Sequence, residues 1–192
     1  MRYALAALVA LAALACASYL PPTAADFDAT VTRADFADWL ASYKLETKRE
    51  TLSKTEKDGI LILEYDWLGD DGTLAIGIHS RVYWTNNSVE ALAAYRKMRD
   101  DPSRDRGPIA WMPVLCGGKW AEEKKCYRLV RIDNQTVGHL LFARRGNVAV
   151  MVTLTGMHSE DARLFEKKLE PELEKLSRYD PRKAPPAATA RR

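Results

Sequence analysis

The sequence predicts one α+β domain, in which an antiparallel β-sheet of about six strands, in two meanders, packs against N-terminal, central and C-terminal helices. Two sets of three segments alternate apolar and polar residues, which is the pattern of half-buried strands. The turn signals Asp58-Gly59 and 69–72 join the segments of the first set. Apolar residues at helical spacing occur before, between and after the two sets. This order places the domain at residues 30–180.

The chain begins with an apolar leader. Arg2 is followed by an unbroken run of alanine, leucine and valine over residues 4–15 and then by small residues, which is the pattern of an export signal. The run is shorter than the roughly 20 residues that a bilayer-spanning helix needs. We therefore expect a signal peptide at residues 1–17 and a short linker with two prolines at 18–29.

Two positions in the leader fit signal cleavage, because 13–15 and 15–17 both have a small residue at each end. Cleavage after Ala15 leaves Cys16 first, and here the segment resembles a bacterial lipoprotein signal. It departs from that pattern because Ala13 stands at position −3 and Leu14 one place late. The resemblance implies a lipid on Cys16 and a location in the periplasm or outer envelope. Secretion without a lipid and a retained leader helix remain alternatives.

The first half of the domain is expected to hold one helix and three strands. Thr32, with Asp35 three residues later, resembles a helix cap, and the apolar residues that follow predict a helix over 33–44. The polar, threonine-rich stretch 45–57 indicates an edge strand. Two clearer strands complete the first meander, over 60–67 and 73–84.

A central helix is predicted over 88–99, capped by Asn87 together with Glu90. Its expected buried residues are Val89, Leu92, Ala93 and Met98. The stretch 109–120 shows no clear pattern and is left unassigned.

The second meander is predicted from three further alternating segments, over 126–133, 137–144 and 147–156. The last of them is expected to be a half-buried strand with Val148, Val150, Val152 and Leu154 on one face. Ser159 is expected to cap the final helix, in which Pro171 should cause a kink or a break.

The element order, and the strand 142–150 that leads to a terminal helix, resemble those of PsbP-like (DcrB-like) proteins. The resemblance covers residues 30–178. It implies helices packed on an antiparallel sheet and a non-enzymatic role as an accessory or docking subunit.

If Cys16 carries a lipid or is removed, Cys116 and Cys126 remain as an even pair. Gly117-Gly118 between them allows the chain to fold back, so a disulfide is predicted, which also suits an exported protein. Free thiols, redox chemistry and a metal site with His139 or His158 are the alternatives. The nine residues between the cysteines do not match the usual zinc spacing.

The positive charge of the chain lies largely outside the domain. Arg2 and the four cations of the tail 181–192 account for five positive charges, so the net charge of +3 becomes −2 over residues 16–180. A nearly neutral domain argues against nucleic-acid binding. The tail is rich in proline and alanine and is expected to be disordered.

No catalytic signature is present: the three histidines stand outside any zinc-protease motif, and neither a nucleophile elbow nor a phosphate-binding loop occurs. His79, Arg81 and Tyr83 share one strand face, where Glu64 or Asp66 from the neighbouring strand could complete an acid–base pocket. The same pattern also describes an ordinary solvated sheet face.

Two other sets of residues could bind a ligand. Arg144 and Arg145 lie at a predicted hairpin and could hold an anion, although arginines are common at exposed turns. Four tryptophans could line a groove or fill the core, namely Trp67, Trp84, Trp111 and Trp120.

These observations predict a non-catalytic, lipid-anchored envelope protein that acts as a binding or accessory module. We expect neither a cofactor nor a metal nor nucleic acid, and a partner that is an envelope protein or a cell-surface component. The alternatives are a secreted enzyme with a pocket at His79 and a thiol-redox protein that uses Cys116 and Cys126.

Overall fold

A computed structural model describes residues 18–101, 108–159, 161 and 163–178. The predicted signal peptide, the lipidation site Cys16 and the basic tail 181–192 lie outside the described residues. None of the described helices has both the length and the apolar character that crossing a bilayer requires.

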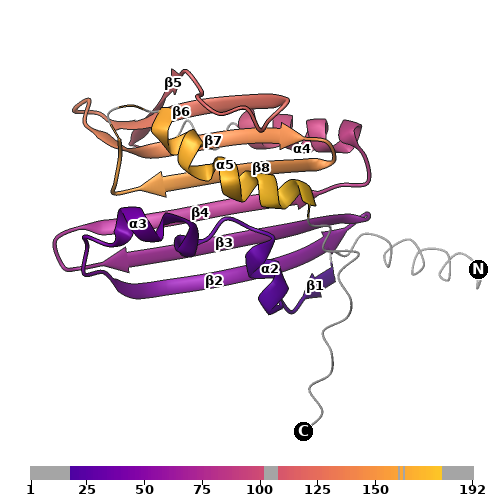
Figure 1. The fold of residues 1–192 in the computed structure, drawn as a ribbon, viewed down its shortest axis with the longest axis horizontal. Helices are drawn as coiled ribbons and strands as arrows, with labels where there is room; N and C mark the ends of the chain where they lie inside the picture. The colour runs from indigo at the N-terminus through magenta and orange to yellow at the C-terminus, as the bar shows by residue number, and fades with distance from the viewer. Residues whose placement is uncertain (1–17, 102–107, 160, 162, 179–192) are drawn as a thin grey trace, which may run out of the picture.

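One antiparallel sheet of eight strands forms the centre of the described structure, in the order β1-β2-β3-β4-β8-β7-β6-β5 (Figure 1). The two predicted meanders are present and join where β4 pairs with β8. The sheet has eight strands rather than about six because a strand forms at each edge, β1 in the expected linker and β5 in the unassigned stretch. The strands are β1 (Ser18–Leu20), β2 (Glu46–Lys57), β3 (Ile60–Asp70), β4 (Ala75–Trp84), β5 (Ile109–Val114), β6 (Glu123–Arg131), β7 (Thr136–Arg145) and β8 (Val148–Thr155).

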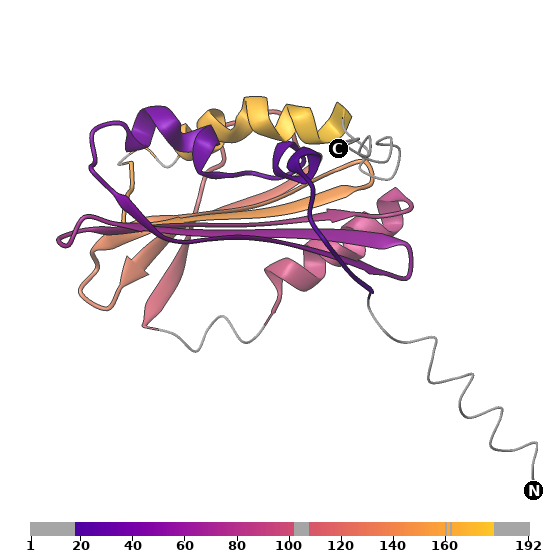
Figure 2. The same ribbon diagram turned by 90° about the horizontal axis from the view of Figure 1, so that it is seen from below.

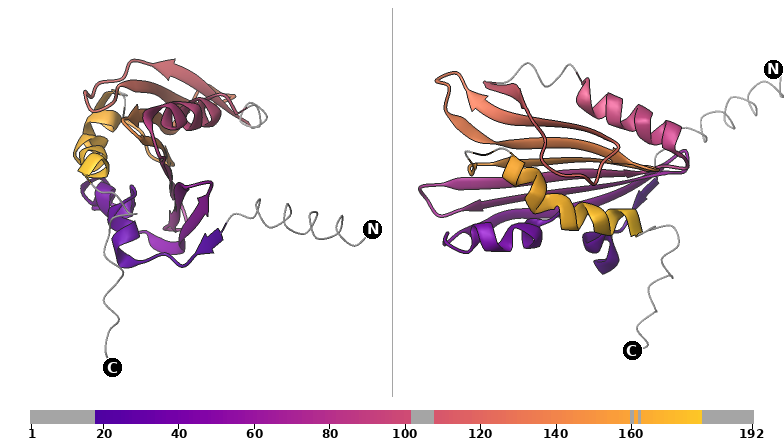
Figure 3. Two further views of the ribbon diagram at one scale, coloured as in Figure 1. Left: turned by 90° about the vertical axis from the view of Figure 1, so that its right-hand side faces the viewer. Right: turned by 45° about the horizontal axis from the view of Figure 1, so that its top comes forward.

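Helices cover both faces of the sheet (Figures 2 and 3). One face, here called the α5 face, lies under the N-terminal helices and α5, and the opposite face, the α4 face, is covered by α4 alone among the described helices. The helical elements are α2 (Ala24–Asp28), the 3₁₀ turn η1 (Arg33–Phe36), α3 (Ala37–Leu40), α4 (Ser88–Arg99) and α5 (Arg163–Arg178).

The main core lies between the α5 face and its helices. Helix α5 contributes an apolar stripe at helical spacing, made of Phe165, Leu169, Leu173 and Leu176, all nearly inaccessible to solvent. The helix is one unbroken element through Pro171, so the predicted break does not occur. It also begins at Arg163 rather than beside Ser159, and Arg163 N–H donates to Asp161 Oδ1 (3.0 Å).

Helix α4 begins where the sequence predicts, because Asn87 Oδ1 accepts hydrogen bonds from the N–H groups of Val89 and Glu90. Its buried face differs from the prediction. Val89 is 75% exposed, whereas Tyr95 is buried together with Met98 against apolar side chains of β7 and β8. Strand β8 is therefore covered on both faces over this part of its length, and not half-buried as expected.

The N-terminal part of the domain also differs from its prediction. The cap at Thr32 forms, since Thr32 N–H donates to Asp35 Oδ2 (2.7 Å), but helical structure ends at Leu40 instead of reaching residue 44. The expected linker at 18–29 contains β1 and α2, and Asp26 is buried and paired with Lys54 (2.9 Å). These residues therefore belong to the folded domain.

Candidate functional site

The α4 face is only partly covered. Helix α4 packs on β7 and β8 and touches β4. On the part of this face that β3 and β4 form, polar side chains lie beside apolar ones such as Ile62 and Leu68. The hairpin register sets Glu64 opposite Arg81 and Asp66 opposite His79. The four side chains thus share one face, as the alternation of each strand predicts.

Glu64 is the centre of this polar cluster. Its Oε1 lies 3.6 Å from His79 Nε2 and also forms a close ion pair with Arg81. Asp66 pairs instead with Arg49, at 2.8 Å. The Glu64 carboxylate is therefore shared between a guanidinium and an imidazole, which suits binding or orientation of a polar group more than proton transfer by a dedicated pair.

A pocket of about 440 Å³ lies beside this cluster on the α4 face. His79 and Arg81 form part of its wall together with Thr153, while its apolar surface comes from Trp111, Leu129, Leu140 and Met151. A second pocket of about 590 Å³ shares Pro108, Ile109 and Thr155 with the first. Together they give the sheet a concave region with an apolar floor and a polar side.

The remaining predicted ligand residues lie elsewhere. Tyr83 lines a different pocket of about 340 Å³, beside α4. Arg144 and Arg145 do not act together, because successive residues of β7 point to opposite faces. Arg144 pairs with Glu122 (2.8 Å), and Arg145 pairs with Glu174 of α5 (2.8 Å).

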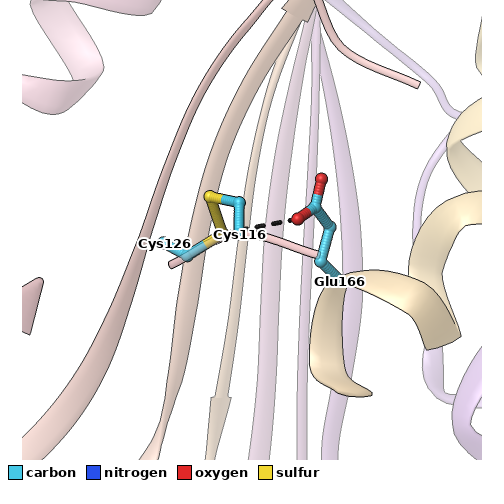
Figure 4. A group of neighbouring side chains, drawn as sticks. All are labelled: Cys116, Cys126 and Glu166. Atoms are coloured by element: carbon cyan, nitrogen blue, oxygen red, sulfur yellow. Dashed lines mark hydrogen bonds between the residues drawn. A yellow bond between two sulfur atoms is a disulfide. The ribbon is translucent and has the colours of Figure 1, made fainter. Parts of the chain in front are cut away.

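The structure contains the predicted disulfide between Cys116 and Cys126, whose Cα atoms are 5.5 Å apart. A buried carboxylate that the sequence analysis missed lies next to it (Figure 4): Glu166 Oε2 of α5 is 3.8 Å from Cys126 Sγ. Lys124 Nζ is 3.1 Å from the other oxygen, Oε1. Among the described residues, these two cysteines and Glu166 also have potential metal-ligand atoms close together, but the sulfurs could bind a metal only after reduction to thiolates, and neither His139 nor His158 belongs to the group.

The other histidines and the tryptophans are explained mainly by packing. His139 is buried, accepts a hydrogen bond from Ser159 N–H (2.9 Å) and stacks on Phe165. Burial, together with the nearby cationic groups of His158 and Arg128, lowers the pKa of His139 from 6.5 to about 4. The core contains Trp67, Trp84 and Trp120, whereas the pocket wall contains Trp111.

Comparisons with known proteins give no match: no protein-family model fits the chain, and neither the curated proteins nor the solved structures include a significant match.

Proposed function

We propose that this chain is an exported cell-envelope protein, anchored by a lipid on Cys16, that binds a partner or ligand on its α4 face without catalysing a reaction. The apolar leader and the lipoprotein-like residues around Cys16 support export and anchoring. The Cys116–Cys126 disulfide supports the same compartment, because such bonds persist mainly in oxidising environments.

The observation that carries the binding role is the 440 Å³ pocket on the α4 face. Pockets with an apolar lining and a few polar groups are typical of ligand sites. The apolar side chains here suit an apolar body, and His79, Arg81 and Thr153 at its wall suit a polar end group. The proposed occupant is therefore an amphipathic ligand or an amphipathic segment of a partner protein.

A PsbP-like fold is part of this proposal. Its support is the order of elements, with helices before, between and after two antiparallel meanders. Members of that family work mostly as accessory or docking subunits. A non-catalytic role agrees with the shared Glu64 carboxylate, which is held by Arg81 as well as by His79.

The test is capture of partners from an envelope extract, with the processed chain as bait and two matched variants. Thr153→Arg places a long cation in the pocket. Thr51→Arg adds the same charge at an exposed position of β2, on the same face but outside the pocket lining. We expect the wild-type chain and Thr51→Arg to capture the same species and Thr153→Arg to lose it.

Equal capture by all three chains, or capture that is lost in both variants, would contradict binding at this pocket. Circular dichroism of each variant checks that the fold is retained.

A further inference from the structure

We propose that the Cys116–Cys126 bond is a thiol–disulfide exchange centre in which Glu166 transfers the proton of Cys126. This activity is additional to the proposed binding role, whose non-catalytic part concerns the α4 face alone, because Cys126 and Glu166 belong to the α5 side of the sheet.

The two cysteines differ in burial. Cys126 lies within β6 and is 4% exposed, whereas Cys116 lies in the loop after β5 and is only partly buried. The neighbouring side chain of Leu115 is 82% exposed. An incoming thiolate can therefore reach Cys116 first, which leaves Cys126 as the buried, resolving cysteine.

The Glu166 carboxylate is placed to accept a hydrogen bond from Cys126 when that cysteine is reduced. Glu166 is 2% exposed, and its Oε1 is neutralised by Lys124. Among the described residues, the atom placed to hydrogen-bond with Oε2 is Cys126 Sγ, at 3.8 Å. That sulfur carries no hydrogen while the disulfide is intact, whereas the thiol of the reduced form can donate to Oε2.

The loop between the cysteines is shaped to admit this carboxylate. A methyl group added at Gly118 would lie 2.8 Å from Glu166 Oε1, so glycine allows the side chain to reach the sulfur. A disulfide that served only to brace the β5–β6 hairpin would need no buried carboxylate, whose burial carries a free-energy cost.

The exchange step balances with a dithiol as reductant. One thiolate of the reductant attacks Cys116 Sγ, the Cys116–Cys126 bond breaks, and Cys126 leaves and takes up a proton through Glu166. The second thiol of the reductant then displaces Cys116, which is protonated from solvent. The reductant loses two protons and two electrons and becomes a disulfide, while both cysteines become thiols.

In the reverse direction, Cys126 gives its proton to Glu166 Oε2. The resulting thiolate attacks the mixed disulfide on Cys116 and expels the partner as a thiolate, which takes a proton from solvent, while Glu166 returns its proton to solvent. Glu166 is then a general base for the resolving step.

The resolving step can be measured directly. The full chain is prepared with Cys16→Ser, so that Cys116 and Cys126 are its only thiols. The reduced protein is mixed with oxidised glutathione, quenched with acid and followed by intact mass. Glu166→Gln removes the base, and Glu170→Gln makes the same charge change one turn further along α5, where Glu170 accepts a hydrogen bond from Lys119 N–H (2.7 Å).

We expect a glutathione adduct on Cys116 to accumulate in Glu166→Gln, with the resolving rate reduced about 100-fold, and no such change in Glu170→Gln. A slowing of less than about tenfold would overturn the role of Glu166. Initial adduct formation on Cys126, or a native disulfide that dithiothreitol reduces only after unfolding, would overturn the exchange centre itself. If Glu166→Gln does not fold, Gly118→Ala decides instead, because it displaces the carboxylate without changing a charge and should also slow resolution.

Discussion

The buried His139 predicts a specific loss of stability in acid. Its imidazole lies on β7 against Phe165, accepts a hydrogen bond from Ser159 N–H, and faces the cationic side chains of His158 and Arg128. Protonation would remove the acceptor and place a charge in the core. The folded state therefore favours the neutral ring.

The size of the effect follows from the pKa of His139, which is about 4 in the folded chain against an ordinary value of 6.5. Because the folded pKa is the lower one, the unfolded state binds the proton first. The stabilisation is thus complete above about pH 6.5 and is lost as the pH falls towards 4. At about 1.4 kcal/mol for each pH unit, the loss is about 3 kcal/mol.

Urea unfolding of the wild-type chain and of His139→Gln, between about pH 8 and pH 4, isolates this contribution. The difference in unfolding free energy between the two chains should shrink by about 3 kcal/mol across that range. The comparison of the two chains is needed because the pKa of Asp35 is raised to about 6, chiefly by burial. As the pH falls, protonation of Asp35 therefore increases the unfolding free energy of both chains, opposite in sign to the effect of His139. A difference that does not change with pH would show that His139 is not kept neutral by the folded chain.

Three further measurements test the packing and the bonds that hold the domain together. Reduction of Cys116–Cys126 should lower the unfolding free energy by somewhat less than about 3 kcal/mol, as expected for a short closed loop, and an unchanged urea midpoint would argue against a stabilising bond. Leu169→Ala removes a fully buried side chain and should lower the free energy of unfolding, measured by thermal unfolding, by about 3 kcal/mol. Leu164→Ala, at a 45% exposed position, should lower it clearly less. Equal losses in the two variants would contradict the orientation of α5. Burial alone would raise the pKa of Asp26, but hydrogen bonds from Lys54 and Thr23 lower it, so the buried carboxylate depends on its partners. Lys54→Met should therefore lower the unfolding free energy by about 3 kcal/mol or more and speed hydrogen exchange in residues 18–28. Unchanged exchange in that segment would show that β1 and α2 do not depend on this pair.

Local signals predicted the elements that depend on local contacts. The helix at 88–99 was predicted to the residue, because the Asn87 cap and the helical spacing lie within one segment. The prediction of its buried face was only partly correct: Met98 is buried as expected, but Tyr95 rather than Val89 turns inward where α4 meets β7 and β8. The side of α4 that is buried is determined by its packing on the sheet.

The edge strands and the disulfide site show the same limit. Strand β5 contains Pro113 and has no regular alternation, and its pairing with β6 defines it. Glu166 reaches Cys126 from 40 residues away in the chain, so no spacing within the sequence could have indicated it. In contrast, Glu64 and His79 share one face because a short turn sets the register of β3 and β4.

The proposed export is the claim on which the function depends, and one intact-mass measurement on protein recovered from its native cells tests it. We expect a chain that begins at Cys16, carries the mass of a lipid, and lacks two hydrogens because Cys116 and Cys126 are joined. A chain that keeps residues 1–15 and contains three free thiols would contradict it.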